Sequence, residues 1–306
     1  MKTLIFIGAN GFIGKSFLDA FSGGFLKVFK IKRLVLISRN IEQIKKIKLN
    51  FKNITLIKGD ISKLKKIPAS DYVIYAATSA NNLKNINNLK QFINLLKKNL
   101  NKPKILFTSS GAVYGKNDKI TSFSERKKIS LVNINKFSNY KRDYAKSKVK
   151  MENIFKKLSK YNYNISIARC FTFIGRHILK DKSYAISSIF NDALNKKFIF
   201  LNSKNSTYRS YLHADDLTFW LLKILFYSNK KCPIFNLGSD EYVSIDKVAK
   251  IVGRHFNKKI VYQNLDKKNQ IDAYLPNINR AKSLLKLKVS LNLKKAIYKV
   301  IRDLNL

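Results

Sequence analysis

The chain has 306 residues and carries 61 Lys and Arg against 18 Asp and Glu, a formal net charge of +43 at pH 7. A hydrophobic fraction of 45% excludes a disordered polycation and is enough to bury a large core. Two cysteines and three histidines exclude a disulfide scaffold and argue against a metal site. The apolar runs are too short for a membrane span or a signal peptide, so we expect a soluble cytoplasmic protein.

The first half of the chain alternates short apolar runs with longer segments of helical spacing. Helices are expected over 82–100 and 139–160. This alternation predicts a doubly wound parallel α/β sheet of the Rossmann type, covered by helices on both faces. The strands are expected over 3–7, 33–37, 53–57, 71–77, 104–108 and 165–170.

The rhythm changes after residue 170. Helices are expected over 184–196, 215–227 and 244–256, and strands over 233–237 and 259–262. The pattern predicts a dinucleotide-binding domain over residues 1–165, to which strand 165–170 and parts of 205–240 return. Residues 171–306 are expected to form mainly a smaller, mixed α/β lobe.

The positive charge is spread along the chain, from Lys2 to Lys299, and arginines are few. Surfaces dedicated to phosphate binding concentrate arginine and place their basic residues in a stripe. The sequence therefore favours a solvated, lysine-rich surface over nucleic-acid binding. The field would still attract anionic ligands, including nucleotide-linked ones.

A glycine-rich segment follows the first expected strand and opens the first helix. Gly8, Gly11 and Gly14 let the backbone turn tightly and approach a pyrophosphate, whose charge then sits on the helix N-terminus. The spacing is GxxGxxG rather than the GxGxxG of the standard fingerprint. We interpret the segment as a dinucleotide phosphate loop. The alternative is a glycine-rich turn without a ligand.

The ends of the next two expected strands carry polar residues that bear on the cofactor. Ser38 and Arg39 stand where NAD sites place an acid on the ribose 2′-hydroxyl, and an arginine there accommodates a 2′-phosphate instead. This favours NADP over NAD, unless Arg39 is simply a surface cation. Asp60 ends the third strand, where it can accept from the adenine amino group or cap a helix over 62–66.

Tyr144 and Lys148 are four residues apart on an expected helix and share a face. A tyrosine that acts as an acid or base near neutrality needs its pKa lowered from about 10, and a nearby ammonium has that effect. The same spacing recurs at Tyr227 and Lys231, at an expected helix end, so context must separate the two pairs. Ser109 and Ser110 supply that context, because they follow the fifth strand at the edge where ligands bind in such folds.

Taken together, these segments resemble the extended short-chain dehydrogenase/reductase superfamily, in its sugar-nucleotide epimerase/dehydratase branch. The resemblance covers nearly the whole chain and depends on the order and spacing of several motifs rather than on any one of them. The matching segments are GANGFIG at 8–14, Asp60, Ala76 and Ala77, SSGAVYG at 109–115, YAKSK at 144–148, RCFTFIG at 169–175, RSYLHADD at 209–216 and FNLGS at 235–239.

The resemblance implies a nucleotide-sugar substrate and three catalytic residues. Ser110 would hydrogen-bond the reacting sugar oxygen, although Ser109 could point inward in its place. Tyr144 would move the proton on that oxygen, and Lys148 would hold the nicotinamide ribose. Substrate contacts are expected from Ser110, Thr172 and Arg209, the last toward the diphosphate, and Asp216 is expected to orient its loop or cap the following helix. The implied cofactor-binding residues are Gly8, Asn10, Gly11, Phe12, Ile13, Gly14, Ser38, Arg39, Asp60, Ile61, Ala76, Ala77, Tyr144 and Lys148.

Two departures from the family pattern bear on the reaction. Gly111 and Ala112 replace the acidic pair that 4,6-dehydratases carry after the catalytic hydroxyl, and decarboxylases usually keep the second acid. What remains is hydride transfer, expected at C4, by an epimerase or a 4-ketoreductase. Thr172 replaces the family's substrate-binding Asn, so the sugar itself stays open. The alternatives are a dehydratase or decarboxylase of the same family and a non-catalytic Rossmann protein that binds NADP(H) or RNA. The resemblance also implies a homodimer that pairs through helices 82–100 and 139–160.

Overall fold

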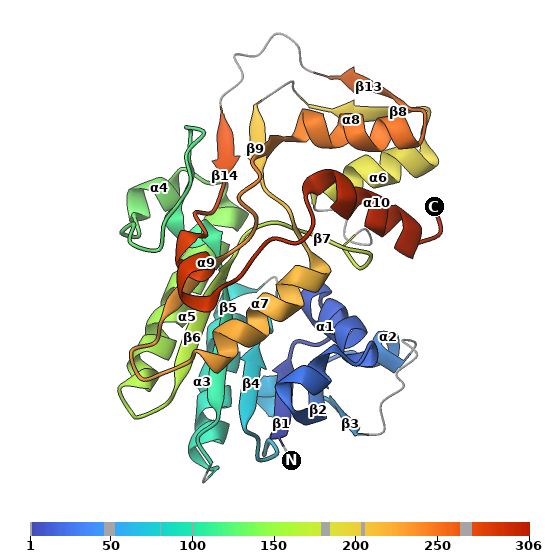
Figure 1. Ribbon diagram of the computed structural model, residues 1–306. Coiled ribbons are helices and arrows are strands. Elements are labelled where there is room, and N and C mark those ends of the chain that lie inside the picture. The colour runs from blue at the N-terminus through green and yellow to red at the C-terminus, as the bar shows by residue number, and fades with distance from the viewer. Residues whose placement is uncertain are drawn as a thin grey trace. The chain divides into compact units, whose positions relative to one another are not determined.

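A seven-stranded sheet is the largest sheet of the computed structural model, which describes residues 2–45, 53–79, 81–99, 101–178, 184–202, 206–263 and 271–306 (Figure 1). Its strand order is β11-β6-β5-β4-β1-β2-β3. The strands from β1 to β6 pair in parallel. Their bounds are β1 (Lys2–Ile7), β2 (Ile31–Ser38), β3 (Ile54–Lys58), β4 (Tyr72–Tyr75), β5 (Lys104–Ser110), β6 (Ile165–Cys170) and β11 (Ile234–Leu237).

The strand order contains a reversal beside β1. The chain passes from β1 to β2 and β3 on one side, then crosses back to β4 on the other side of β1. In register, Ile5 of β1 pairs with Val35 of β2 and Val73 of β4. Open parallel sheets bind ligands at such a switch point, outside the carboxyl ends of the strands. The topology therefore directs the search for a site to the ends of β1, β2 and β4.

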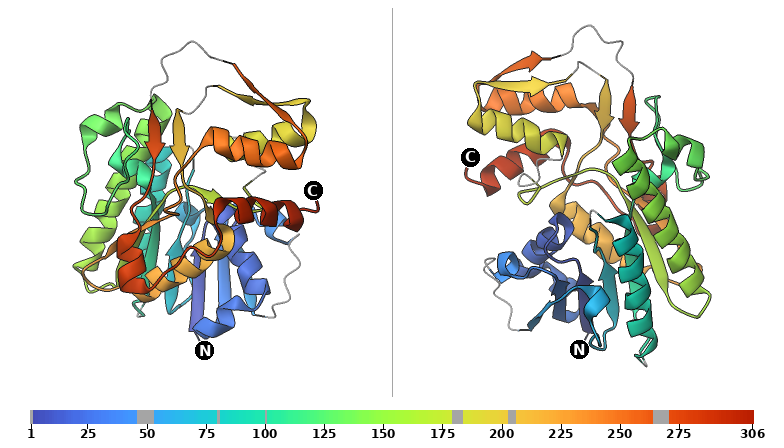
Figure 2. Two further views of the ribbon diagram at one scale, coloured as in Figure 1. Left: turned by 45° about the horizontal axis from the view of Figure 1, so that its top comes forward. Right: turned by 180° about the vertical axis from the view of Figure 1, so that it is seen from behind.

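Both faces of the sheet are covered by helices, as the continuous burial of Leu4–Ile7 and Leu34–Ile37 requires. One face packs on α3 (Asn82–Lys97) and α5 (Asn139–Ser159), which contribute Phe92 and Phe155 to a shared core (Figure 2, right). The other face meets α1 (Phe12–Ser22) and α7 (Ala214–Phe226). Phe17 of α1 lies 5.2 Å from Phe6, and Phe226 of α7 lies 4.7 Å from Tyr72, measured between ring centroids. The short elements here are η1 (Phe25–Phe29), α2 (Glu42–Lys45), η2 (Ile61–Lys63) and η3 (Gly111–Tyr114).

Contacts between residues divide the chain into two compact units. Unit 1 comprises Met1–Val113, Phe137–Cys170 and Thr218–Phe235, and unit 2 comprises Tyr114–Lys136, Phe171–Leu217 and Asn236–Leu306. Three separate segments therefore build each unit. The chain returns to unit 1 after residue 217, so that α7 begins in unit 2 and ends in unit 1.

Unit 2 holds three small sheets. β7 (Phe173–Ile174) pairs in parallel with β10 (Leu212–His213), and β8 (Phe198–Leu201) with β13 (Lys259–Tyr262). β9 (Thr207–Arg209) lies between antiparallel β12 (Val243–Ser244) and parallel β14 (Asp272–Tyr274). The helices α6 (Ala185–Asn195) and α8 (Ile245–His255) pack on β8, as Figure 1 shows. The other helices are α4 (Leu131–Asn135), α9 (Asn279–Leu285) and α10 (Leu293–Asp303).

The predicted doubly wound α/β class is confirmed, with every expected strand of the central sheet present within about two residues of its predicted ends. The expected end of helix 82–100, Leu100, lies outside the described residues. The short strands β7, β8, β9, β10, β12 and β14 and the helices α2, α4, α9 and α10 were not predicted. Within the described part of the chain, the helices are too short or too polar to span a membrane.

Candidate functional site

The glycine loop connects β1 to α1, and its glycines differ in what the fold requires of them. Gly8 has φ +93°, and a Cβ there would lie 2.7 Å from the Ala77 nitrogen. A Cβ on Gly14 would lie 2.6 Å from the carbonyl carbon of Ala9. Real Cβ contacts are longer than this, so both positions need glycine for the fold itself.

Gly11 is different, because the fold leaves room for a side chain there. Its φ of −75° and ψ of 172° suit any residue, and an added Cβ would lie 3.5 Å from the Gly8 carbonyl oxygen. Gly11 is the N-cap of α1, and no described side chain caps that helix or places an acid in its first turn. The open amide groups and the helix dipole favour an anion at this end. A phosphate group therefore fits at Gly11 with no competing carboxylate.

A pocket of about 270 Å³ opens within unit 1 at the switch point of the sheet. The ends of β1, β2, β3 and β4 form its wall. Of the residues expected to bind the cofactor, Ile61, Ala76 and Ala77 line this pocket, whereas Phe12, Ile13 and Gly14 form the first turn of α1 and are not among its lining residues. Its lining residues are Ile7, Gly8, Asn10, Gly11, Ile37, Ser38, Arg39, Asn40, Gly59, Asp60, Ile61, Ala76, Ala77, Thr78 and Asn88.

Charge along the pocket is set by Arg39 and Asp60. Arg39 is exposed at the end of β2, beside half-buried Ser38. Asp60 accepts a hydrogen bond from the Ser62 amide at 3.2 Å, caps η2, and lies 2.8 Å from Lys84 Nζ. Partial burial would raise the pKa of Asp60, but its hydrogen bonds with Lys84 and Ser62 lower it overall. Asp60 is therefore an ionised N-cap of η2. Of the two roles expected for it, contact with adenine and capping of a helix, the structure shows the second.

Two asparagines present polar atoms that have no protein partner among the described residues. The side-chain oxygens of Asn10 and Asn88 are both buried without a hydrogen bond there, and both residues line the pocket. A buried amide oxygen without a partner is costly, and a bound ligand or water would satisfy it. Asn88 was missed by the sequence analysis. The available signal was a polar residue next to Leu89 on the buried face of helix α3.

The end of β5 separates the two candidate serines. Ser109 donates from Oγ to Glu152 Oε1 at 2.7 Å and is 3% exposed, so a buried carboxylate occupies its hydroxyl. Ser110 faces the other way along the strand, and its Oγ accepts from the Ala112 amide at 3.2 Å. The two serines therefore differ in their surroundings: Ser109 is held by the Glu152 carboxylate, and Ser110 lies on the opposite face of β5.

Lys148 connects α5 to the same strand. Its Nζ donates to the Thr108 carbonyl oxygen at 3.0 Å and lies 5.7 Å from the ring centroid of Tyr144. Lys148 is 5% exposed, and this burial lowers the pKa of its ammonium to about 8. Tyr144 is half-buried on α5. The structure therefore places Tyr144 and Lys148 together beside β5, where Thr108 is two residues from Ser110.

The predicted substrate residues of unit 2 are arranged as follows. The Thr172 hydroxyl is buried without a hydrogen bond from the described residues. Arg209 donates to Asp272 Oδ2 at 2.6 Å and to the carbonyl oxygens of Tyr208 and Asp272, so a carboxylate pairs with it. Asp216 lies in the first turn of α7 rather than at its N-cap, and it accepts from the Ser290 amide at 2.8 Å.

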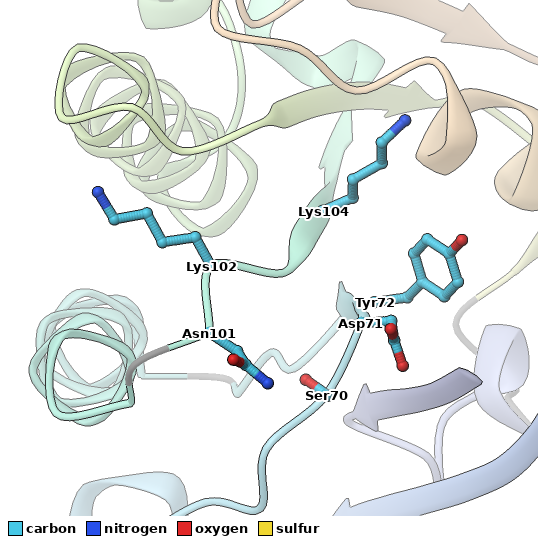
Figure 3. A pocket seen from close by; sticks show the side chains of 6 residues that line it. All are labelled: Ser70, Asp71, Tyr72, Asn101, Lys102 and Lys104. Atoms are coloured by element: carbon cyan, nitrogen blue, oxygen red, sulfur yellow. The ribbon is translucent and has the colours of Figure 1, made fainter. Parts of the chain in front are cut away.

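A second hollow, of about 620 Å³, lies at the opposite ends of β4 and β5 and is lined by Asp71, Tyr72, Lys102 and Lys104 among others (Figure 3). Its charged groups already have partners. Lys104 donates to the Phe226 carbonyl at 2.6 Å, and Asp71 accepts from the Thr3 amide at 2.7 Å. The two ammonium groups point apart in Figure 3. Because ligands in parallel sheets bind at the carboxyl ends of the strands, this surface is a poor candidate.

The strand order, the glycine turn and the pocket at the switch point define a Rossmann-type α/β protein. A family model, the NAD dependent epimerase/dehydratase family, matches residues 4–238. The chain belongs to that family. No curated protein sequence matches it significantly.

Solved structures with the same fold cover nearly the whole chain. One is a dTDP-glucose 4,6-dehydratase from Bacillus anthracis in complex with NAD, with 17% identity over 99% of this chain and 96% of that one, and a TM-score of 0.78. The UDP-N-acetylglucosamine 4-epimerase of Bacillus cereus has 18% identity over 100% of this chain and 97% of its own, with a TM-score of 0.74. A UDP-glucose 4-epimerase from Thermotoga maritima, solved with UDP-glucose, has 15% identity over 99% of this chain and 98% of its own, with a TM-score of 0.78.

Proposed function

We propose that the protein is an NAD(P)-dependent enzyme that transfers hydride at a carbon of a nucleotide sugar, C4, as a 4-epimerase or a 4-ketoreductase. The observation that carries the proposal is the placement of buried Lys148 between Tyr144 and the Thr108 carbonyl, at the end of β5. Family membership supports the nucleotide-sugar class. The cytoplasm, where nucleotide sugars and dinucleotides meet, is the proposed location.

The glycine loop and the pocket residues would hold the dinucleotide. Gly8 and Gly11 fit its pyrophosphate, and the orphan oxygen of Asn10 offers an acceptor beside it. Ser38, Arg39 and Asp60 fit the adenosine end, and Ala76 and Ala77 allow close backbone approach at the end of β4. When bound, the nicotinamide supplies hydride transfer to and from the sugar carbon.

Three side chains would handle the proton on the reacting sugar oxygen. Tyr144 takes that proton when the sugar alcohol is oxidised and returns it when the ketone is reduced. The Lys148 ammonium favours the phenolate form of Tyr144 and holds the ribose hydroxyls. Ser110 donates a hydrogen bond to the same oxygen and stabilises the negative charge that develops on it.

The residues after Ser110 favour hydride transfer alone. Gly111 and Ala112 form the start of η3 and carry no group that exchanges a proton. A 4,6-dehydratase has to remove one proton and deliver another to expel water, and it needs side chains for both steps. The family comprises dehydratases as well as epimerases, so these two positions favour the epimerase or ketoreductase. For the same reason a decarboxylase is less well supported.

A turnover assay tests the proposal. Purified protein is incubated with UDP-, dTDP- and GDP-hexoses, with oxidised or reduced dinucleotide, and the products are analysed by NMR. We expect a C4 epimer or a change between C4 ketone and alcohol. A 4-keto-6-deoxy sugar or a pentose would instead show a dehydratase or a decarboxylase. No conversion together with salt-sensitive RNA binding would support the non-catalytic alternative.

Cofactor preference follows from Arg39, and we propose that NADP binds more tightly than NAD. Arg39→Ala is expected to weaken NADP binding about 10- to 100-fold, the loss of a charged hydrogen bond, with little effect on NAD. Arg33→Ala is the matched control, because Arg33 is exposed on the same strand at its other end. Isothermal titration gives the affinities. Equal weakening of both cofactors, or tighter NAD binding by the wild type, would contradict the preference.

The proposal for unit 2 is that Arg209 contacts the diphosphate of the substrate and Thr172 a hydroxyl. The buried Thr172 hydroxyl lacks a partner among the described residues, which supports a ligand there. Arg209 would exchange the Asp272 carboxylate for the phosphate oxygens, which present a similar bidentate partner.

We also propose that the enzyme is a homodimer formed through α3 and α5. Leu83 of α3 is 72% exposed, and a partner helix would cover such a side chain. Sedimentation equilibrium is expected to give twice the 35.3 kDa mass of the chain. A monomer at micromolar concentration would contradict this arrangement.

A further inference from the structure

A buried ion pair lies beneath the candidate catalytic lysine. Arg169 of β6 donates from Nε and Nη2 to the two carboxylate oxygens of Glu152 on α5, at 3.0 and 2.7 Å. Ser109 of β5 donates to the same carboxylate at 2.7 Å. Glu152 is 0% exposed and Arg169 is 2% exposed. One carboxylate therefore ties one turn of α5 to two neighbouring strands.

Stability alone does not explain why charges are buried here. The surrounding face is aromatic, with the Phe107 and Phe155 rings stacked 4.7 Å apart. Replacing a buried ion pair by apolar residues is often neutral or stabilising, because desolvation offsets the attraction of the charges. Unlike an apolar contact, the two parallel hydrogen bonds of an Arg–carboxylate pair fix the relative orientation of the groups they join. That directionality is useful where a helix must be held at one rotation and height.

The helix in question carries the candidate catalytic groups. Tyr144, Lys148 and Glu152 follow one another at intervals of four residues on α5 and share one face. Lys148 bonds to Thr108 of β5, and Glu152 bonds to the next residue of that strand, Ser109. Consecutive residues of β5 therefore fix consecutive turns of α5.

We propose that Glu152 is a positioning residue, which holds α5 through Arg169 and Ser109 so that Lys148 stays on the Thr108 carbonyl beside Tyr144. The proposal rests on the proposed function, because it concerns the placement of the groups that carry it. Because Glu152 is fully buried, we assign it no contact with substrate or cofactor.

The groups facing Lys148 show how Glu152 also acts through charge. The Phe107 ring and the Thr108 carbonyl face it from β5, Cys170 from β6 and Tyr144 from its own helix. Burial raises the pKa of the Cys170 thiol to about 12, so it is neutral under ordinary conditions. With that thiol neutral, Glu152, itself paired with the Arg169 guanidinium, is the described carboxylate that raises the pKa of Lys148 against the larger, lowering effect of burial. Because Lys148 is charged below its pKa of about 8, its ribose contact is expected to weaken as the pH rises through that value.

The test compares Glu152→Gln, Glu152→Asp and the wild type. Glu152→Gln removes the charge, so we expect the alkaline limb of dinucleotide binding to move to lower pH and kcat to fall about 10- to 100-fold. Glu152→Asp keeps the charge but shortens the tether, so kcat is expected to fall while the alkaline limb stays near the wild-type pH. Thermal unfolding monitors the fold of each variant.

Lys156→Met is the matched control. Lys156 lies on the same helix and is 40% exposed. Its 3.9 Å contact with the Glu152 carboxylate is long and screened by solvent, so the substitution is expected to leave kcat and the pH profile unchanged. Folded Glu152 variants with wild-type kcat and pH profile would overturn the proposal. Failure of both variants to fold would assign Glu152 to stability and would also overturn it. The pH profile of dinucleotide binding needs no sugar, so it remains decisive if the proposed hydride transfer fails.

Discussion

Tyr144→Phe is expected to lower turnover about 10²- to 10⁴-fold, the usual contribution of a positioned acid or base. The variant loses only the phenolic hydroxyl of a half-buried side chain on α5, so its fold and its affinity for the dinucleotide are expected to change little. Steady-state kinetics and cofactor titration measure the two quantities separately. The loss should appear in kcat with KM little altered, because the proposed role of the hydroxyl is to move the proton rather than to bind the sugar.

The chain offers a matched control in Tyr140, one turn earlier on the same helix. Tyr140 is 69% exposed, so Tyr140→Phe is expected to keep wild-type kinetics. A Tyr144→Phe enzyme with wild-type kcat would show that another group moves the proton. An equal loss in both variants would point to the helix rather than to the hydroxyl.

Two glycine substitutions are expected to have opposite consequences. Gly14→Ala places a methyl group 2.6 Å from the Ala9 carbonyl carbon and is expected to destabilise unit 1 by about 3 kcal/mol or more. Gly11→Ala meets no such contact and is expected to change stability by about 1 kcal/mol or less. Its methyl group would instead occupy space that the pyrophosphate needs, so dinucleotide affinity should fall more than about tenfold.

Chemical denaturation and cofactor titration separate the two effects. The expected result is a stable Gly11→Ala protein that binds dinucleotide poorly and a Gly14→Ala protein with a greatly reduced unfolding midpoint. If Gly11→Ala bound dinucleotide as tightly as the wild type, the loop would be a structural turn without a phosphate. A stable Gly14→Ala protein would mean that the α1 contact relaxes more readily than the structure indicates.

The sequence was informative wherever local chemistry determines local structure. The strand, glycine turn and helix at 2–22 could be predicted because tight turns need glycine and buried parallel strands are continuously apolar. Tyr144 and Lys148 could be paired because helical spacing alone brings them to one face.

Other features depend on partners that are distant in the sequence. Glu152 meets Arg169 and Ser109 only after α5, β5 and β6 have assembled, and no spacing rule links the three. The sheet of β9, β12 and β14 joins segments more than 30 residues apart, and its strands of two or three residues are too short to show a period. The pairing of Arg209 with Asp272 is hidden for the same reason.

We propose that this chain moves a hydride between the sugar and a dinucleotide held at the carboxyl end of the sheet. The direct measurement uses nucleotide hexoses that carry deuterium at C4, mixed with excess protein and oxidised dinucleotide and quenched within one turnover. Mass spectrometry of the dinucleotide is predicted to find it reduced and carrying the deuterium. An oxidised, unlabelled dinucleotide, with the deuterium released to water from a converted sugar, would contradict hydride transfer through the dinucleotide.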